Sequence, residues 1–489
     1  MEETTIDSPP ESPKHEDRFS LLPNALIHHI LSFVADMKIT VQMSILSNRW
    51  RHVWKSVPAL TFAFEYEPGK ANNFREFVTR TLMLRDDTDI HSLTVLWIDY
   101  LDMGSEVAGK VSTWVLSAAR RKVKELVLCV GFNRSQSLSY EFPQCFFRSE
   151  SLTELHLFMG NMYRSKLVLP ESIYLPKLES VKFEDLLMSE VSMNQFFTGC
   201  PALKSVTISN CLMGELQIIS NTLKHFKIAY SSFDPTINEL GTSVLLFAPN
   251  LESFDTKHQP SLLFGLSVNS LVKADVEVIV QEKRNFPDTY SEIAGETKDV
   301  YATAMMLMLE KLHTVKELTL SPRFIQIISR SPDLWKTTRP QLANLHCMEL
   351  CTFLSKSCAQ AILYLLRISP NIDSLSVRID KDCFAEQPTD LYSDEINFAS
   401  ETIEDYWKPG LTWPCMPLHL KVVELVDVIG SVNELRFIEV LLKYAAKLEK
   451  VVLFWNWDGP GNHMERVMKF NEKLHSLPRA SSRVSTLFY

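Results

Sequence analysis

The sequence predicts an α/β protein in which a short, all-helical unit precedes a long solenoid of alternating strands and helices. A helical pattern of apolar residues follows residue 19. From residue 90 onward, short apolar segments recur with amphipathic stretches between them, as expected of a repeat array. The chain has 489 residues, of which 46% are hydrophobic, so it can bury the large core that such an array requires.

The helical unit carries two apolar stripes at helical spacing. The first follows Leu22-Pro23 and consists of Leu26, Ile27, Ile30, Leu31 and Val34. The second, which Ser47 can cap and Pro58 ends, consists of Trp50, Val53, Trp54 and Val57. A unit this small buries too little surface to be secure alone. We therefore expect both tryptophans to be exposed, on a face that needs a partner.

The recurring segments have the form apolar-x-x-apolar-x-apolar, which suits one short strand with its apolar residues turned inward. At Leu203, Val206, Ile208 and Cys211 the complete pattern of a leucine-rich repeat is present. Most intervals between segments are close to the roughly 20–29 residues of such repeats. We predict an irregular leucine-rich-repeat solenoid with a curved, mostly parallel sheet. Its segments begin at Ile90, Val123, Leu152, Leu178, Leu203, Leu223, Leu251, Leu271, Val315, Leu345, Ile372, Leu420 and Leu448.

The stretches between these segments supply the convex helices of the solenoid. We expect helices at residues 111–121, 304–312, 358–368 and 435–448. Two intervals are longer than the rest, and we interpret the polar stretch 281–300 and the acidic stretch 380–410 as loops inserted into the array. The acidic stretch could dock a basic partner, although we favour a solvated insertion.

The formal net charge of −9 has a local origin. Residues 1–18 carry six acids and two bases, residues 380–410 carry nine and two, and together they contribute −11. The remainder sums to +2 and lacks the basic balance usual in nucleic-acid-binding proteins, so we expect no nucleic-acid partner. Residues 1–18 also contain little that can be buried, which predicts a disordered acidic tail.

The outward residues of the strand segments are expected to form one continuous concave face. Their mixture of charge and polarity suits a protein surface, so we predict that this face binds a target protein. The candidate substrate-binding residues are His156, Lys182, Thr207, Lys227, Asp255, Glu349, Ser376 and Glu424.

One segment, from Gly104 to Gly109-Lys110, has the spacing of a phosphate-binding loop. The next residue is Val111, whereas a nucleotide-binding loop needs a hydroxyl there for Mg²⁺. The following residues fit a convex helix, so we interpret the segment as a turn of the solenoid.

Patterns of catalytic or metal-binding residues are not evident in the sequence. His28 and His29 point in different directions on a helix, and no metal-binding motif accompanies them. Cys347, Cys351 and Cys358 lack the two-residue spacing of a zinc site, so we interpret them as buried thiols. The nucleophile-elbow, dinucleotide-binding and kinase motifs are absent from the sequence. We predict a protein that is not an enzyme and needs no metal or cofactor.

The cysteines also indicate the compartment. There are nine, an odd number without framework spacing, and the acidic N-terminus lacks the apolar core of a signal peptide. No run reaches the roughly 18 apolar residues of a bilayer span. We expect free, mostly buried thiols, location in the nucleus, the cytoplasm or both, and no membrane partner.

Two stretches resemble a known family. FSLLPNALIHHILSFVADMKITVQMSILSNRWRHVWKSVPAL resembles an F-box, with its LP pair and its S-x-L-S-x-R-W-x-x-x-W core. PCMPLHLKVVELVDVIGSVNELRFIEVLLKYAAKLEKVVLF resembles the FBD region of plant F-box proteins. Together with the repeats, they are similar to the plant F-box/FBD/leucine-rich-repeat proteins. The resemblance implies an F-box at 19–60, repeats at 61–410 and an FBD region at 411–489 that continues the array.

The resemblance implies a substrate receptor of an SCF-type (Skp-cullin-F-box) ubiquitin ligase. Its F-box would bind a Skp-type adaptor and through it a cullin scaffold, while the repeats bind an unknown protein substrate. The adaptor-binding residues implied are Leu22, Pro23, Ile27, Ile30, Leu31, Leu46, Ser47, Trp50 and Trp54. The alternative is a leucine-rich-repeat interaction scaffold whose F-box no longer binds an adaptor.

Overall fold

The computed structural model describes residues 22–34, 36–45, 50–64, 69–98, 107–131, 139–160, 166–211, 214–230, 243–260, 263–280, 293–338, 340–380, 419–457 and 463–489. Several predictions therefore fall outside the described residues: the tail at 1–18, most of the two insertions, the adaptor-binding candidates Leu46 and Ser47, and Gly104.

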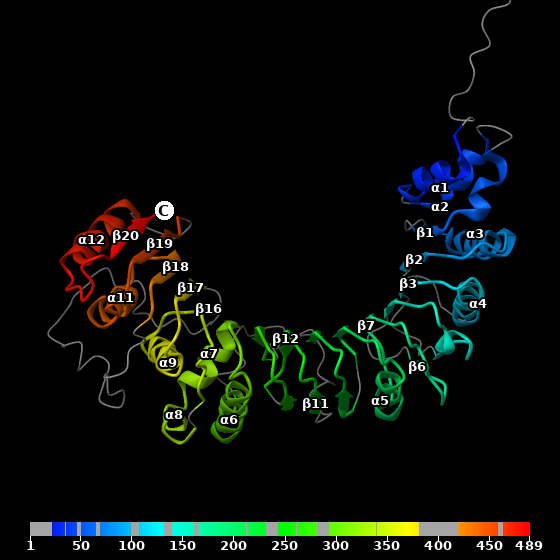
Figure 1. Ribbon diagram of the computed structural model, residues 1–489. Helices are drawn as coiled ribbons and strands as arrows, with labels where there is room; N and C mark the ends of the chain where they lie inside the picture. The colour runs from blue at the N-terminus through cyan, green and yellow to red at the C-terminus, as the bar shows by residue number, and fades with distance from the viewer. Residues whose placement is uncertain are drawn as a thin grey trace, which may run out of the picture.

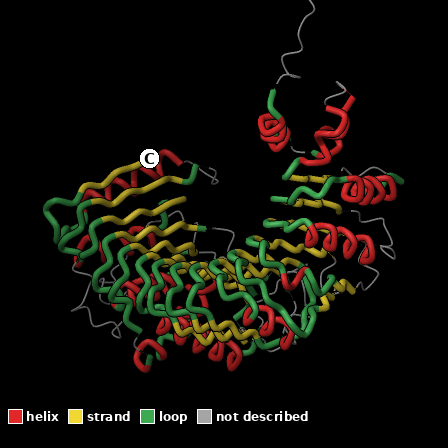
Figure 2. Tube along the Cα trace, turned by 45° about the vertical axis from the view of Figure 1, so that its right-hand side comes forward, coloured by secondary structure: helices red, strands yellow, loops and turns green. Residues whose placement is uncertain are grey.

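The predicted α/β solenoid is confirmed. Within the described residues, fifteen parallel strands form one curved sheet and follow each other across it in chain order. Figures 1 and 2 show an open arc with strands on the inner side and helices on the outer side. The strands are β1 (Ala59–Ala63), β2 (Ser92–Ile98), β3 (Glu125–Gly131), β5 (Glu154–Gly160), β7 (Ser180–Glu184), β8 (Ser205–Ser209), β10 (His225–Ala229), β12 (Ser253–His258), β14 (Lys273–Val278), β15 (Glu317–Leu320), β16 (Cys347–Thr352), β17 (Ser374–Ile379), β18 (Val422–Val428), β19 (Lys450–Trp455) and β20 (Ser485–Phe488).

All thirteen predicted strand segments correspond to strands of this sheet. Each segment begins two residues before its strand, as Leu203 precedes Ser205 of β8. The leading residues of the thirteen segments are at most 2% exposed, so each one anchors the turn that enters its strand. The outermost strands β1 and β20 extend the sheet at both ends beyond the predicted repeats.

The convex layer contains the predicted helices and others. α4 (Val107–Arg120), α9 (Lys356–Arg367) and α11 (Val432–Tyr444) lie close to their predicted positions. α6 (Gly295–Lys311) begins nine residues before the predicted helix, so the end of the proposed insertion at 281–300 is helical instead. The remaining convex helices are α3 (Ala71–Leu84), α5 (Glu190–Thr198), α7 (Pro322–Ser329), α8 (Leu334–Thr337) and α12 (His463–Ser476).

In the middle of the arc a second sheet replaces the helices. β9 (Leu216–Ile219), β11 (Ser243–Phe247) and β13 (Leu263–Ser267) pair in parallel on the convex side between α5 and α6 (Figure 1). The shortest intervals, of 20 residues, fall here, and a strand needs fewer residues than a helix to span the convex side. A smaller pair, β4 (Ser139–Glu141) with β6 (Lys166–Val168), lies nearer the N-terminus.

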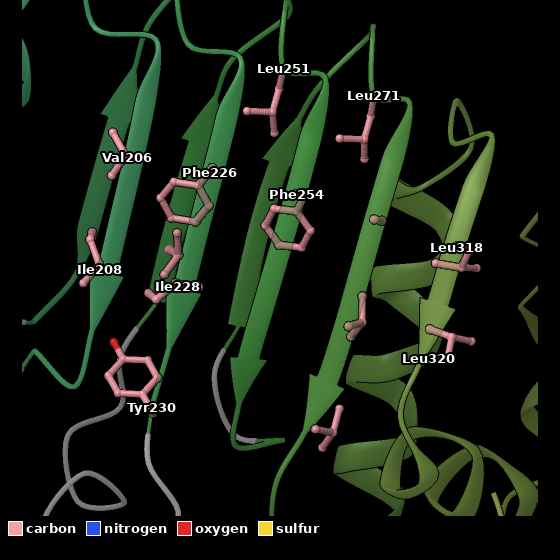
Figure 3. Packing of buried hydrophobic residues seen from close by; sticks show 14 of the residues in the cluster. Val206, Ile208, Phe226, Ile228, Tyr230, Leu251, Phe254, Leu271, Leu318 and Leu320 are labelled. Carbon is pink, nitrogen blue, oxygen red and sulfur yellow. The ribbon is translucent and has the colours of Figure 1, made fainter. Parts of the chain in front are cut away.

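The core consists of inward side chains in register from strand to strand. Figure 3 shows Val206, Phe226 and Phe254 on the adjacent strands β8, β10 and β12. The rings of Phe226 and Phe254 stack with centroids 6.1 Å apart. Full burial of a large apolar side chain contributes about 1.5–3 kcal/mol, so each repeat is stabilised mainly by its neighbours.

Candidate protein-docking surfaces

The N-terminal helical unit consists of four short elements that precede the sheet. They are α1 (Asn24–Ser32), α2 (Met37–Gln42) and the 3₁₀ turns η1 (Met43–Ile45) and η2 (Trp50–Ser56). Pro23 precedes α1 with φ of −56°, and its carbonyl accepts hydrogen bonds from the backbone N–H groups of Leu26 and Ile27. Because proline fixes φ and has no N–H of its own, it suits the start of a helix.

The stripe on α1 divides between two environments. Ile27 is fully buried and Leu31 is 2% exposed, and both pack with Trp50, Val53 and Val57 in a small core. Leu26 and Ile30, on the neighbouring edge of the same stripe, are 48% and 43% exposed. The stripe is therefore wide enough both to close the unit and to leave an apolar surface open.

The expectation of two exposed tryptophans is wrong. Trp50 is 8% exposed and belongs to the small core with Ile27 and Leu31. Trp54 is 9% exposed and packs with Met37 into the main core of the solenoid. A unit this small closes by using its largest side chains internally and by attaching one of them to the repeats.

The open surface of the unit is formed by other apolar side chains. Phe33 is 76% exposed, and the remaining members, with Leu26 and Ile30 from α1, are Ile39 (48%) and Ile45 (84%). Of the predicted adaptor-binding residues, Pro23 and Ile30 are exposed, Leu22 is half-buried, and Ile27, Leu31, Trp50 and Trp54 are buried. We call Leu26, Ile30, Phe33, Ile39 and Ile45 the apolar face. Because period alone does not say which edge of a wide stripe faces outward, the sequence did not identify Phe33, Ile39 or Ile45.

The concave sheet brings all eight predicted substrate-binding residues into one register row. His156 pairs with Lys182, Lys182 with Thr207, and the row runs on through Lys227 and Asp255. On the C-terminal strands it contains Glu349, Ser376 and Glu424. The sequence reading missed seven members of the same row: Thr61, Thr94, Val127, Asp275, Thr319, Val452 and Leu487. Whether the row binds a substrate stays a prediction.

Ion pairs between neighbouring strands, and one within β7, cover the middle of the concave face. Lys227 Nζ lies 2.6 Å from Asp255 Oδ2, and Lys257 Nζ lies 2.7 Å from Glu277 Oε1. Glu184 Oε2 is 2.6 Å from His156 Nε2 and 2.9 Å from Lys182 Nζ. The hydrogen bond with His156, aided by Lys182, holds the pKa of Glu184 below its ordinary value although burial opposes this. Exposed pairs of this kind add little stability, so their main effect is to balance charge on the face.

Comparisons with known proteins agree with this architecture. A family model described as "FBD-associated F-box protein At5g56370, LRR repeats" matches residues 111–263. The putative F-box/LRR-repeat protein At3g18150 of Arabidopsis thaliana is 25% identical over 444 residues, which cover 89% of this chain and 86% of the relative. F-box/FBD/LRR-repeat protein At5g22660 of the same plant is 24% identical over 451 residues, 90% of each chain. The chain is therefore similar to plant F-box/LRR-repeat and F-box/FBD/LRR-repeat proteins, which supports the resemblance noted in the sequence.

The F-box is attached to the first repeats by polar contacts as well as by Trp54. Arg85, after α3, donates from Nη1 to the carbonyl oxygen of Val57 at 2.7 Å. Within the helical unit, His28 Nε2 on α1 is 3.2 Å from Ser56 Oγ at the end of η2. The backbone N–H of His91 donates to the carbonyl of Pro58 at 2.7 Å, at the entrance to β2. Burial lowers the pKa of Arg85 to about 10, which leaves the side chain protonated at neutral pH.

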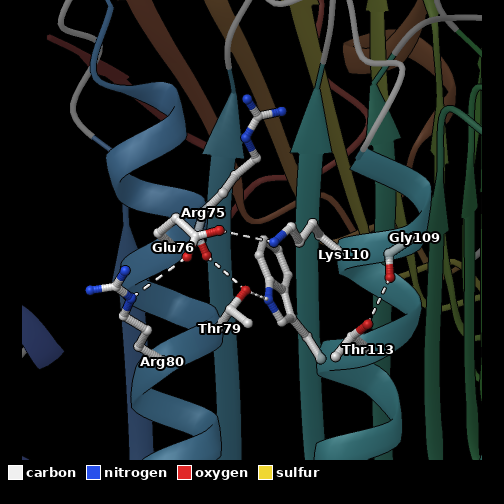
Figure 4. Close-up of polar contacts among 8 residues, drawn as sticks. Arg75, Glu76, Thr79, Arg80, Gly109, Lys110 and Thr113 are labelled. Carbon is white, nitrogen blue, oxygen red and sulfur yellow. Dashed lines mark hydrogen bonds and ion pairs between the residues drawn. The ribbon is translucent and has the colours of Figure 1, made fainter.

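The described residues of the possible phosphate-binding loop form a helix and not a loop. Gly109 and Lys110 lie within α4, and Figure 4 shows Lys110 reaching across to α3. Its Nζ is 3.0 Å from Glu76 Oε1, and Thr113 Oγ1 donates to the Gly109 carbonyl at 2.9 Å. Lys110 thus ties two convex helices together.

The thiols are distributed differently from the prediction. Among the described residues, seven cysteines are free; Cys200, Cys211 and Cys358 are buried, but Cys347 and Cys351 are half-buried. The prediction that Cys347 and Cys351 are buried is therefore wrong. Both alternate with the core residues of β16 and face the concave side. In the described part of the chain, no group of three or more His, Cys, Asp or Glu residues could hold a metal ion, and no helix could cross a membrane.

Proposed function

We propose that this protein is the non-catalytic substrate-recognition subunit of an SCF-type E3 ubiquitin ligase. The apolar face of the F-box binds a Skp-type adaptor, and through it a cullin scaffold, while the concave sheet binds the target protein. The observation that carries the proposal is an open apolar face at one end of a curved sheet, with Trp54 and Arg85 fixing the two together.

The composition of the apolar face supports adaptor binding. Its five members are each between 43% and 84% exposed on a unit of about 40 residues, and an exposed apolar concentration of this kind marks a protein-interaction site. Residues 19–58 also sum to +3, because four bases outnumber Asp36. The family's adaptors are acidic, so this charge would speed their encounter with the F-box.

The junction between the F-box and the repeats supports the proposal of a receptor that acts by holding its target in position. A receptor needs no catalytic group, because it raises the concentration of a target lysine near a conjugating enzyme held elsewhere in the complex. That effect depends on a fixed distance between adaptor and target. The core that Trp54 shares with the repeats and the hydrogen bond of Arg85 supply such a connection. We propose that the protein acts in the nucleus, the cytoplasm or both.

Adaptor capture tests the proposal. Full-length protein should retain a Skp-type adaptor, and the double variant Leu26→Asp/Ile30→Asp should lose it by at least about tenfold because two charges then enter the apolar contact. Ile219→Asp is the matched control, since Ile219 is 69% exposed on β9 in the convex sheet. Failure of the wild-type protein to bind any of several adaptors would refute the proposal and favour a repeat scaffold.

A further inference from the structure

The C-terminal half of the concave sheet carries carboxylates at a regular interval. Register places Asp275, Glu349 and Glu424 in one row on the alternate strands β14, β16 and β18, with Thr319 and Ser376 between them. The same row continues to Val452 on β19 and Leu487 on β20. We call these seven residues the C-terminal row.

The charges of this row are less well balanced than those of the central strands. Within the described residues, Glu349 and Glu424 form no ion pair, whereas Asp255 and Glu277 are each bridged by a lysine. Lys273, Arg378 and Lys450 lie on flanking rows, on β14, β17 and β19, and form no ion pair with either carboxylate within the described residues. Burial, followed by the charges of Glu349, Glu317 and Glu424, raises the pKa of the Cys347 thiol, consistent with a negative potential here.

The end of the row is apolar, and its last member is partly exposed, whereas Val452 is buried. Leu487 and Phe454 are each 37% exposed, and the ring of Phe454 stacks on that of Tyr489 with centroids 5.2 Å apart. Val452 lies between Glu424 and Leu487 in the register. The surface therefore offers three carboxylates followed by an apolar platform, and its chemical complement is a segment with spaced cations followed by an apolar residue.

The spacing of the row specifies that segment further. Neighbouring strands lie about 4.8 Å apart, so carboxylates on alternate strands repeat at about 10 Å. A polyproline-II chain has 3 residues per turn and rises about 3.1 Å per residue, so every third side chain lies on the same side at about 9 Å. A fully extended β-strand does not match, because its side chains at this interval alternate between two sides.

We propose that the C-terminal row binds a polyproline-II-like segment of the target protein in which Lys or Arg recurs at every third residue. An aliphatic or aromatic residue, three positions after the last cation, occupies the platform at Leu487. This inference rests on the proposed function, because it describes the target that such a receptor would hold.

Peptide binding to the full-length protein tests the inference. The probe is a fluorescent, proline-rich peptide with Lys at positions 1, 4 and 7 and Leu at position 10; the control peptide has the same composition with the three lysines adjacent. We expect the spaced peptide to bind at least about fivefold more tightly, and Glu349→Gln/Glu424→Gln to weaken it about tenfold. Leu487→Ser should weaken it by a smaller factor. The control Glu252→Gln removes a carboxylate that is bridged to Lys224 just before β12, outside the C-terminal row, and should have no effect.

Each other result counts against the inference. It is wrong if the spaced peptide does not bind, if both peptides bind equally, or if the double variant binds as the wild type does. The comparison of peptides needs no variant, so it stands even if the double variant fails to fold. Adaptor capture by the same preparation separates the two proposals, because adaptor binding without peptide binding refutes only this one.

Discussion

Arg85 donates a hydrogen bond from its guanidinium to the backbone carbonyl of Val57, 28 residues earlier in the chain, at 2.7 Å. Val57 belongs to the small core of the F-box, whereas Arg85 directly follows α3 of the first repeat. The side chain is only 6% exposed. One buried side chain therefore connects the helical unit, which we propose binds the adaptor, to the array that would hold the target.

We expect Arg85→Ala to loosen this junction. The change leaves the Val57 carbonyl without its donor in a buried position, which costs about 1–3 kcal/mol of unfolding free energy. Urea denaturation measures the loss, and hydrogen exchange at residues 50–56 should become faster. Arg80→Ala, on α3 just before Arg85, is the control, since the Arg80 side chain is 76% exposed. Equal stability of both variants would show that the bond is unimportant.

Substitutions at Trp50 and Leu26 should affect the stability of the F-box and its adaptor binding separately. Trp50→Ala removes a buried ring from the F-box core and should lower the unfolding free energy of that unit by about 3–5 kcal/mol. Leu26→Ala removes a side chain that is 48% exposed, so stability should change little while adaptor affinity falls. Thermal unfolding and adaptor titration of both variants check this. Loss of affinity in Trp50→Ala without loss of stability would instead place Trp50 in the interface.

The repeats could be predicted because each strand carries its own signal. A buried residue such as Leu251 or Leu271, followed by alternating apolar positions, fixes both the start of the strand and the side that faces the core. The concave position of residues such as Lys227 and Asp255 then follows from alternation alone. β20 is short and partly exposed along its length, so it carries little of this signal.

The F-box could be predicted in outline but not in orientation. Helical period places Ile27 and Ile30 on one broad stripe, yet the first is buried and the second is 43% exposed. The difference depends on where Trp50 packs, which is a tertiary contact. Ion pairs such as that of Lys227 with Asp255 could not be predicted from the sequence either. They join residues 28 positions apart, which only the register of the sheet brings together.

His258 should make the stability of the central repeats depend on pH. The ring is fully buried beside Phe264, its Nδ1 is 2.6 Å from the carbonyl oxygen of Gln259, and its Nε2 has no hydrogen-bond partner. Burial lowers its pKa from 6.5 to about 4. Between these values the unfolded chain binds the proton more readily than the folded one. Stability is thus fully present above pH 6.5 and falls as the pH drops to 4, by about 3 kcal/mol in total.

Urea denaturation of His258→Gln at a series of pH values isolates this contribution, because other groups titrate in both proteins. The variant should lose less stability than the wild type between pH 6.5 and pH 4. His225→Gln, at an exposed position on β10, is the matched control and should follow the wild type. Parallel curves for the wild type and His258→Gln would contradict the assignment.

Gly199 and Gly109 should respond to alanine in opposite ways. A Cβ atom at Gly199 would lie 2.5 Å from the backbone oxygen of Ile173, which cannot move without displacing the chain around it. We expect Gly199→Ala to lower the unfolding free energy by about 1–3 kcal/mol, the usual cost of overpacking. A Cβ atom at Gly109, within α4, would meet nothing within 4 Å, so alanine there should stabilise the helix by about 0.5–1 kcal/mol. Thermal unfolding of both variants measures the difference, and a stable Gly199→Ala protein would mean that the chain at Ile173 can yield.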